Sequence, residues 1–189
     1  AENTFPEGDG YFWRTTDYPR SFRWQDFFNL VEEQHDPVRG LSLFFIADQN
    51  GDGNYLQDTD NVLFYMTGKP HIYFYDTNTY LPGSYADHMT SFGGMLTDPQ
   101  GQMSILRWLE AGAAGSWGTV QEPGASTPKF VNAEIFVPEY FGGRNMIGAI
   151  YSSVRVIYQG IAVGDPLTRP WGSKVEEFGI NQYTLTTTI

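Results

Sequence analysis

Apolar residues recur along the chain with two different spacings, which predict alternating helices and strands. In the segment SFRWQDFFNLVEEQH, Trp24, Phe27, Phe28 and Val31 fall at positions i, i+3, i+4 and i+7, the spacing of an amphipathic helix. Short apolar runs predict strands instead. They lie at 41–47, which we expect to be buried, at 61–68 and at 71–77, and residues 1–12 predict an arm or a first strand.

The second half of the chain continues this alternation. Asp98 followed by Pro99 is typical of a helix N-terminus, and Asn145 is a suitable cap for a helix in NMIGAIYSSV. The segment AEIFVPEYF also has a helical pattern, whereas GSWGTV and GIAVGDPL predict short strands. Strands that alternate with helices favour an α/β fold, a three-layer sandwich around a mainly parallel sheet.

The length of 189 residues predicts one domain with an appendage. We assign residues 1–172 to a single α/β domain and residues 173–189 to a C-terminal extension, because RPWG marks an apparent domain end. In the tail NQYTLTTTI, Tyr183, Leu185 and Thr187 alternate with polar residues, which gives it high β propensity. We expect such a tail to pair with the sheet edge of a neighbouring copy and to build a homo-oligomer or filament.

The composition limits which partners the chain can bind and in which cell compartment we expect it. Twenty-two acidic and 11 basic residues give a net charge of −11 without any basic cluster, which excludes nucleic acid as an expected partner. No run of apolar residues is long enough for a membrane span, and the lack of cysteine rules out a Cys nucleophile in this chain. The start, AENTFPEGDG, is typical of a chain already cut from a longer precursor, and we expect a bacterial extracellular, cell-surface or periplasmic location.

An acidic loop separates two apolar runs in FIADQNGDGNYLQDTDNVLFY. Oxygen-bearing residues at every second position, followed by glycine, match the D-x-N-x-D-G pattern of loops that bind Ca²⁺ through six to eight oxygens. The candidate ligands are Asp48, Asn50, Asp52, Asn54 through its backbone carbonyl, Asp58 and Asp60. The pattern is incomplete, because position 12 is Thr59 instead of glutamate. We expect a structural Ca²⁺ ion; the alternative is an ion-free turn rich in Asp, Asn and Gly.

A polar cluster at the end of a predicted strand is the candidate for catalysis. In SYADHMTSFGG, His88 would act as the base and Ser91 or Thr90 as the nucleophile, with Glu122 nearby across the sheet. Asp87 cannot simply orient His88, because neighbouring residues of a strand point to opposite faces. The alternative is a structural cluster whose side chains bond the backbone of adjacent loops.

Three motifs carry a resemblance to a known family: LPGSYADHMTSFGG, QMSILRWLEAGAAGSWGTVQEP and GIAVGDPLTRPW. Their order and spacing over residues 61–171 resemble the C-terminal half of an uncharacterised bacterial family found in species that carry exosortase, the cell-surface sorting system. More distantly, this half is similar to the α/β sandwich of caspase-like and gingipain-like peptidases, which need a His and a Cys at the ends of neighbouring strands. Relatives often carry that Cys directly after EP, where this chain has Gly124.

The resemblance implies a caspase-like fold and a surface context more than a reaction. We therefore expect a secreted or cell-surface calcium-binding domain with a structural or interaction role, which includes self-assembly. The alternative is a caspase-like or gingipain-like hydrolase, or an inactive relic of one, that lacks the Cys nucleophile.

Overall fold

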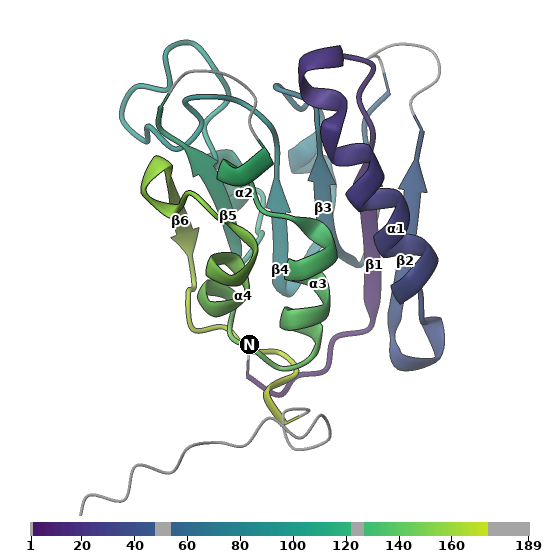
Figure 1. Cartoon of the computed structure of the whole chain (residues 1–189). Coiled ribbons are helices and arrows are strands. Elements are labelled where there is room, and N and C mark those ends of the chain that lie inside the picture. Colours follow the sequence, from purple (N-terminus) through teal and green to yellow (C-terminus); the bar gives the residue numbers. More distant parts are fainter. Residues whose placement is uncertain (1, 48–53, 122–126, 174–189) are drawn as a thin grey trace, which may run out of the picture.

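The computed structural model describes residues 2–47, 54–121 and 127–173. It shows an α/β protein built on a six-stranded sheet with the strand order β2-β1-β3-β4-β5-β6 (Figure 1). The strands are β1 (Gly8–Trp13), β2 (Leu41–Ile46), β3 (Val62–Thr67), β4 (Tyr80–Asp87), β5 (Gly115–Thr119) and β6 (Gly160–Gly164). All neighbouring pairs are parallel except β5 and β6. The predicted mainly parallel sheet is therefore confirmed.

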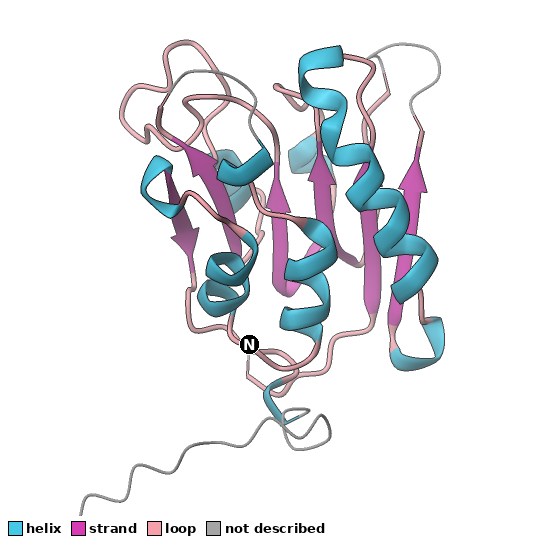
Figure 2. Cartoon of the chain, in the orientation of Figure 1, coloured by secondary structure: helices cyan, strands magenta, loops and turns pink. Residues whose placement is uncertain are grey.

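Helices and connecting segments cover the two faces of the sheet unequally. The helices α1 (Trp24–Gln34), α3 (Ala133–Phe141) and α4 (Met146–Ser153) lie on one face, in front of the sheet in Figure 2. The opposite face is covered by the short α2 (Leu106–Glu110) and by residues of the connections before β3 and β4. Short 3-10 helices lie at η1 (Tyr18–Arg23), η2 (Pro37–Arg39), η3 (Tyr75–Thr77), η4 (Thr127–Lys129) and η5 (Ile157–Gln159). This arrangement is the expected three-layer sandwich.

Two apolar clusters fill the space on either side of the sheet. In the larger one, Phe64 of β3 lies with its ring centroid 6.2 Å from that of Phe136 and 6.5 Å from that of Trp171. The smaller one centres on Trp108 of α2, whose ring centroid is 5.2 Å from that of Tyr65. All six residues of β3 are buried, as expected for a central parallel strand with both faces covered.

Three of the predicted helices form where the sequence places them. α1 buries Phe27 and Leu30 against the sheet, in keeping with its apolar spacing. α3 and α4 begin at asparagine caps: the side chain of Asn132 accepts a hydrogen bond from the amide of Ile135, and that of Asn145 accepts one from Gly148. These caps satisfy backbone N–H groups that the first turn of a helix leaves without a partner.

The expected strand at 71–77 is absent from the described structure. β3 and β4 are parallel neighbours, so the chain between them must return to the end of the sheet where β3 began. Residues 68–79 make this return across the face of the smaller cluster, and Phe74 has a φ of +60°, which interrupts any extended run. The aromatic residues in this segment pack on the sheet without belonging to it, as the ring of Tyr75 does 5.9 Å from that of Trp108.

Two other expectations need correction. The strand at 41–47 is β2, at the edge of the sheet, and it is only partly buried, with Phe44 42 % exposed. No helix begins at Pro99: Asp98 accepts a hydrogen bond from the amide of Gln100 in a turn. Gln100 and Gly101 both have positive φ values, which end helical geometry, and α2 starts only at Leu106.

Candidate functional site

His88 follows directly after β4, at the carboxyl end of the parallel strands, and it is 1 % exposed. The indole N–H of Trp108 donates a hydrogen bond to Nδ1 of His88 over 2.9 Å. Nδ1 therefore carries no proton, and Nε2, 2.9 Å from the carbonyl oxygen of Met103, donates to it. Burial lowers the pKa of His88 to about 4. In this structure His88 is a neutral residue with both ring nitrogens occupied, which leaves no lone pair for a general base.

Asp87 points to the opposite face of the sheet, as strand geometry requires. Its carboxylate accepts two hydrogen bonds from the guanidinium of Arg23, over 2.8 and 3.0 Å, and one from the hydroxyl of Tyr85 over 3.1 Å. Arg23 also donates to the carbonyl groups of Thr67 and Val131. Burial raises the pKa of Asp87, and the charge of Arg23 opposes this effect. The network joins the start of α1, the ends of β3 and β4 and the segment before α3.

The other members of the predicted catalytic cluster are not assembled around His88 in the described structure. Ser91 is partly exposed, and its carbonyl accepts a hydrogen bond from the hydroxyl of Thr119 over 2.9 Å. The hydroxyl of Thr90 is hydrogen-bonded to the side chain of Gln102. No hydrogen bond joins Ser91 and His88 within the described residues. Glu122 lies outside those residues, so its part in the cluster remains a prediction.

A buried lysine lies beside the end of the acidic loop. Lys69, which follows β3, is 1 % exposed, and its ammonium group donates a hydrogen bond to the carbonyl of Asn54. The ammonium also lies 4.3 Å from the ring centroid of Tyr55 and 5.4 Å from that of Trp13. The carbonyl expected at position 7 of a calcium loop thus already has a cationic partner, a feature that the sequence pattern did not reveal.

The structure separates Asn54 from Asp58 and Asp60. Asn54 lies near Lys69, past the carboxyl end of β3, whereas Asp60 accepts a hydrogen bond from Thr79 next to the amino ends of β3 and β4. The six residues of β3 span about 17 Å, and two ligands of one Ca²⁺ ion lie within roughly 5 Å of each other. Asp58 and Asp60 therefore do not join Asn54 around one ion. Asp48, Asn50 and Asp52 lie outside the described residues.

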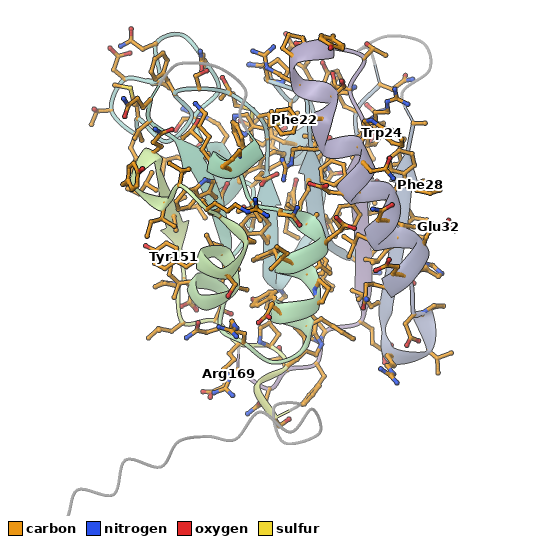
Figure 3. The ribbon with its side chains drawn as sticks, viewed as in Figure 1. Phe22, Trp24, Phe28, Glu32, Tyr151 and Arg169 are labelled. Carbon is orange, nitrogen blue, oxygen red and sulfur yellow. The ribbon has the colours of Figure 1, made fainter. Side chains whose placement is uncertain are left out.

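The two edges of the sheet differ in their backbone hydrogen bonding, a feature that sequence reasoning missed. At the β2 edge, the amide and carbonyl of Leu41 both pair with Asp36. The outward groups of Leu43 face the imidazole of His35, whose Nδ1 lies 3.0 Å from the amide nitrogen and 2.9 Å from the carbonyl oxygen. Figure 3 shows Phe28 on the side of α1 toward this edge, where its ring packs on Phe45. Nδ1 of His35 is either a donor or an acceptor, so it satisfies one of these two groups at a time, and the outward groups of Phe45 have no partner among the described residues. The chain itself thus covers the β2 edge at Leu41 and Leu43.

The β6 edge is open as far as the described residues go. The amide of Val120 donates to the carbonyl of Gln159, which sets the phase of the antiparallel ladder between β5 and β6. In that phase Gly160, Ala162 and Gly164 direct their backbone groups away from β5, and no described residue pairs with them. The signal in the sequence is the run VIYQGIAVG, which places no charged residue on an edge strand.

Comparisons of the chain with protein-family models, with curated proteins and with solved structures find no match. Within residues 2–47, 54–121 and 127–173, no helix is both long and apolar enough to cross a membrane. The same residues contain no cluster of three or more His, Asp or Glu side chains arranged to hold a metal ion.

Proposed function

We propose that this chain is a calcium-binding α/β domain of a secreted or cell-surface bacterial protein, with a structural or interaction role that includes self-assembly. The observation that carries the proposal is the inequality of the two sheet edges. An open edge strand is a template for another strand, and proteins usually protect such edges. The chain covers the β2 edge at Leu41 and Leu43 with Asp36 and His35, whereas the β6 edge has no equivalent among the described residues.

The geometry around His88 favours this role over hydrolysis. A general base needs a free lone pair within reach of its substrate, and a pKa near the working pH. His88 is buried, its Nδ1 accepts from Trp108, and its pKa is about 4. The hydrogen bonds of His88 and Asp87 tie together segments distant in sequence, which is the work of a structural cluster.

The self-assembly part of the proposal is tested by removing residues 181–189. Sedimentation velocity of the full chain over a dilution series is expected to show concentration-dependent assembly, and the shortened chain is expected to remain monomeric. The deleted segment contains no charged residue, so both chains carry the same net charge. Assembly that survives the deletion unchanged would end the proposal.

The calcium part rests on the sequence pattern of residues 48–53, and the chain that follows this pattern is held in place at Leu56. Leu56 is buried, and its carbonyl accepts a hydrogen bond from Asn78 over 3.0 Å. We expect Ca²⁺ at one hundred times its dissociation constant to stabilise the folded chain by about 2.7 kcal/mol. The measurement is the melting temperature with excess Ca²⁺ and with chelator.

Matched variants locate the ion. Asp52→Asn is expected to abolish the effect of Ca²⁺ on the melting temperature. Asp58→Asn is expected to leave it intact, because Asp58 lies with Thr77 near the amino end of the sheet. A melting temperature that is indifferent to chelator in the unsubstituted chain would remove calcium from the proposal.

A second candidate is a hydrolase of caspase-like fold, or its relic. One observation favours it: β4 and β5 are neighbours, and His88 follows the first of them. The segment EPG, where relatives carry a Cys, follows the second, at positions 122–124. Peptide and ester hydrolysis by the unsubstituted chain and by His88→Ala separates the candidates. Activity that disappears in His88→Ala would support the hydrolase, and no activity in either supports the structural role.

A further inference from the structure

A groove of about 200 Å³, lined by apolar side chains and by the polar backbone of the strand, runs beside the open edge, between β6 and α4. Ile147 and Tyr151 line it from the helix, and Ala162 lines it from the strand. Tyr151 is 52 % exposed and lies on the side of α4 nearest β6 (Figure 3). A strand added along β6 would therefore form backbone hydrogen bonds with this edge. Every second side chain of the added strand would lie in the groove.

The C-terminal segment NQYTLTTTI has the chemistry to occupy this position. Tyr183, Leu185, Thr187 and Ile189 lie at alternate positions, so an extended strand presents them on one face, toward the groove. Threonines at 184, 186 and 188 form the other face and have high β propensity. Neither the segment nor the β6 edge has a charged side chain, so pairing them buries no charged side chain.

The length of the chain beyond the described domain suits an exchange between copies. The described residues end at Ser173, whose amide donates to Asn3 over 2.7 Å. The seven residues 174–180 can reach at most about 23 Å, which makes them long enough to serve as a linker in the exchange proposed below. Each copy carries a net charge of −11, and charges repel over a Debye length of about 8 Å at physiological salt. An uncharged strand on such a linker joins two acidic domains without pressing their surfaces together.

We propose that β6 and the groove beside α4 form a strand-accepting site, and that its occupant is residues 181–189 of a second copy. This inference rests on the proposed self-assembly and names the surfaces that carry it. The contact is heterologous, because a tail on one copy meets an edge on the next, so it propagates into a filament unless two copies exchange tails and close a dimer.

The test substitutes one residue on each side of the contact in the full chain. Ala162→Pro removes an outward N–H from β6, a change that an edge strand tolerates, and Ala162→Ser is its control. Leu185→Gln removes an apolar side chain from the tail, and Thr186→Gln is its control on the opposite face. Sedimentation velocity is expected to show assembly weakened at least about tenfold for Ala162→Pro and Leu185→Gln, and unchanged for both controls.

Circular dichroism establishes that each variant is folded. Should Ala162→Pro not fold, Ile147→Gln tests the same site from the helix side of the groove, with the same expected weakening. Assembly of Ala162→Pro equal to that of Ala162→Ser overturns the inference. If deletion of 181–189 nevertheless abolishes assembly, the self-assembly proposal stands and only the site is wrong. A monomeric full chain whose tail amides are protected from hydrogen exchange would mean that the tail pairs with its own edge, which also overturns the inference.

Discussion

Arg23 and Asp87 form a charged pair in which both side chains are at most 2 % exposed. Removing one partner of such a pair leaves the other charge buried, which costs about 3–5 kcal/mol. We expect Asp87→Asn to lower the free energy of unfolding by this amount in urea denaturation. Asp17→Asn is the control: it breaks the partly exposed pair with Arg20 and is expected to cost less than about 1 kcal/mol. Equal costs for the two variants would contradict the structural role of Arg23–Asp87.

His88 makes the stability of the fold depend on pH. In the unfolded chain it takes up a proton near pH 6.5, but in the folded chain only near pH 4, because burial lowers its pKa. Between these values the unfolded state binds more protons, so stability falls as the pH is lowered. The loss attributable to His88 is on the order of 3 kcal/mol. His88→Gln is expected to have a lower free energy of unfolding at pH 7. It is also expected to lose less of that free energy than the unsubstituted chain between pH 7 and pH 4.5, as measured by urea unfolding at both values. A decline as steep as that of the unsubstituted chain would show that other groups cause it.

At the scale of elements, the local pattern of apolar residues predicted the helices and strands whose burial follows one regular period. β3 is buried along its whole length, and α1 has one apolar face, so periodicity sufficed for both. The segment 71–77 has the composition of a strand, but parallel pairing of β3 with β4 requires it as a crossover. The order of strands in the sheet decides the conformation of such a segment, and a window of seven residues does not reveal that order.

The candidate site was predictable in position but not in its contacts. Strand periodicity correctly separated Asp87 from His88 and placed both at a strand end. The partners of His88 are Met103 and Trp108, which approach only through the loop after β4. Likewise, the hydrogen bond of Lys69 to Asn54 depends on how the chain crosses the sheet. Side chains that meet through tertiary packing leave no spacing signal in the sequence.

The cap of α4 allows a test at the scale of one element. The side chain of Asn145 accepts a hydrogen bond from the amide of Gly148 over 2.9 Å. Asn145→Ala removes this acceptor and is expected to lower the free energy of unfolding by about 1 kcal/mol in urea denaturation. Asn145→Asp keeps an acceptor at the cap and is expected to stay within about 0.5 kcal/mol of the unsubstituted chain. The reverse order would mean that the cap contributes nothing to α4.

At the scale of the whole molecule, the two edges of the sheet differ in how readily they can accept an added strand. The β2 edge is covered at Leu41 and Leu43 by Asp36 and His35, while the β6 edge is open along its length among the described residues. If β6 alone accepts an added strand, assembly through it produces linear filaments or exchanged dimers, and not branched aggregates. The covered part of the β2 edge therefore matters as much to the proposed assembly as the open β6 edge.

Net charge sets how this assembly responds to salt. With −11 on each copy, repulsion acts over about 30 Å at 0.01 M salt and about 8 Å at 0.15 M. Seven residues, 174–180, can span at most about 23 Å, so in the proposed assembly screening at 0.15 M already frees the two domains from each other. We expect sodium chloride to strengthen assembly between these concentrations, as measured by sedimentation velocity, and to have little further effect up to 1 M. The chain without residues 181–189 has the same charge and should stay monomeric throughout, which separates strand pairing from salting-out. Assembly that continues to strengthen to 1 M would indicate direct contact between acidic surfaces, and assembly that weakens with salt would indicate attraction between complementary charges.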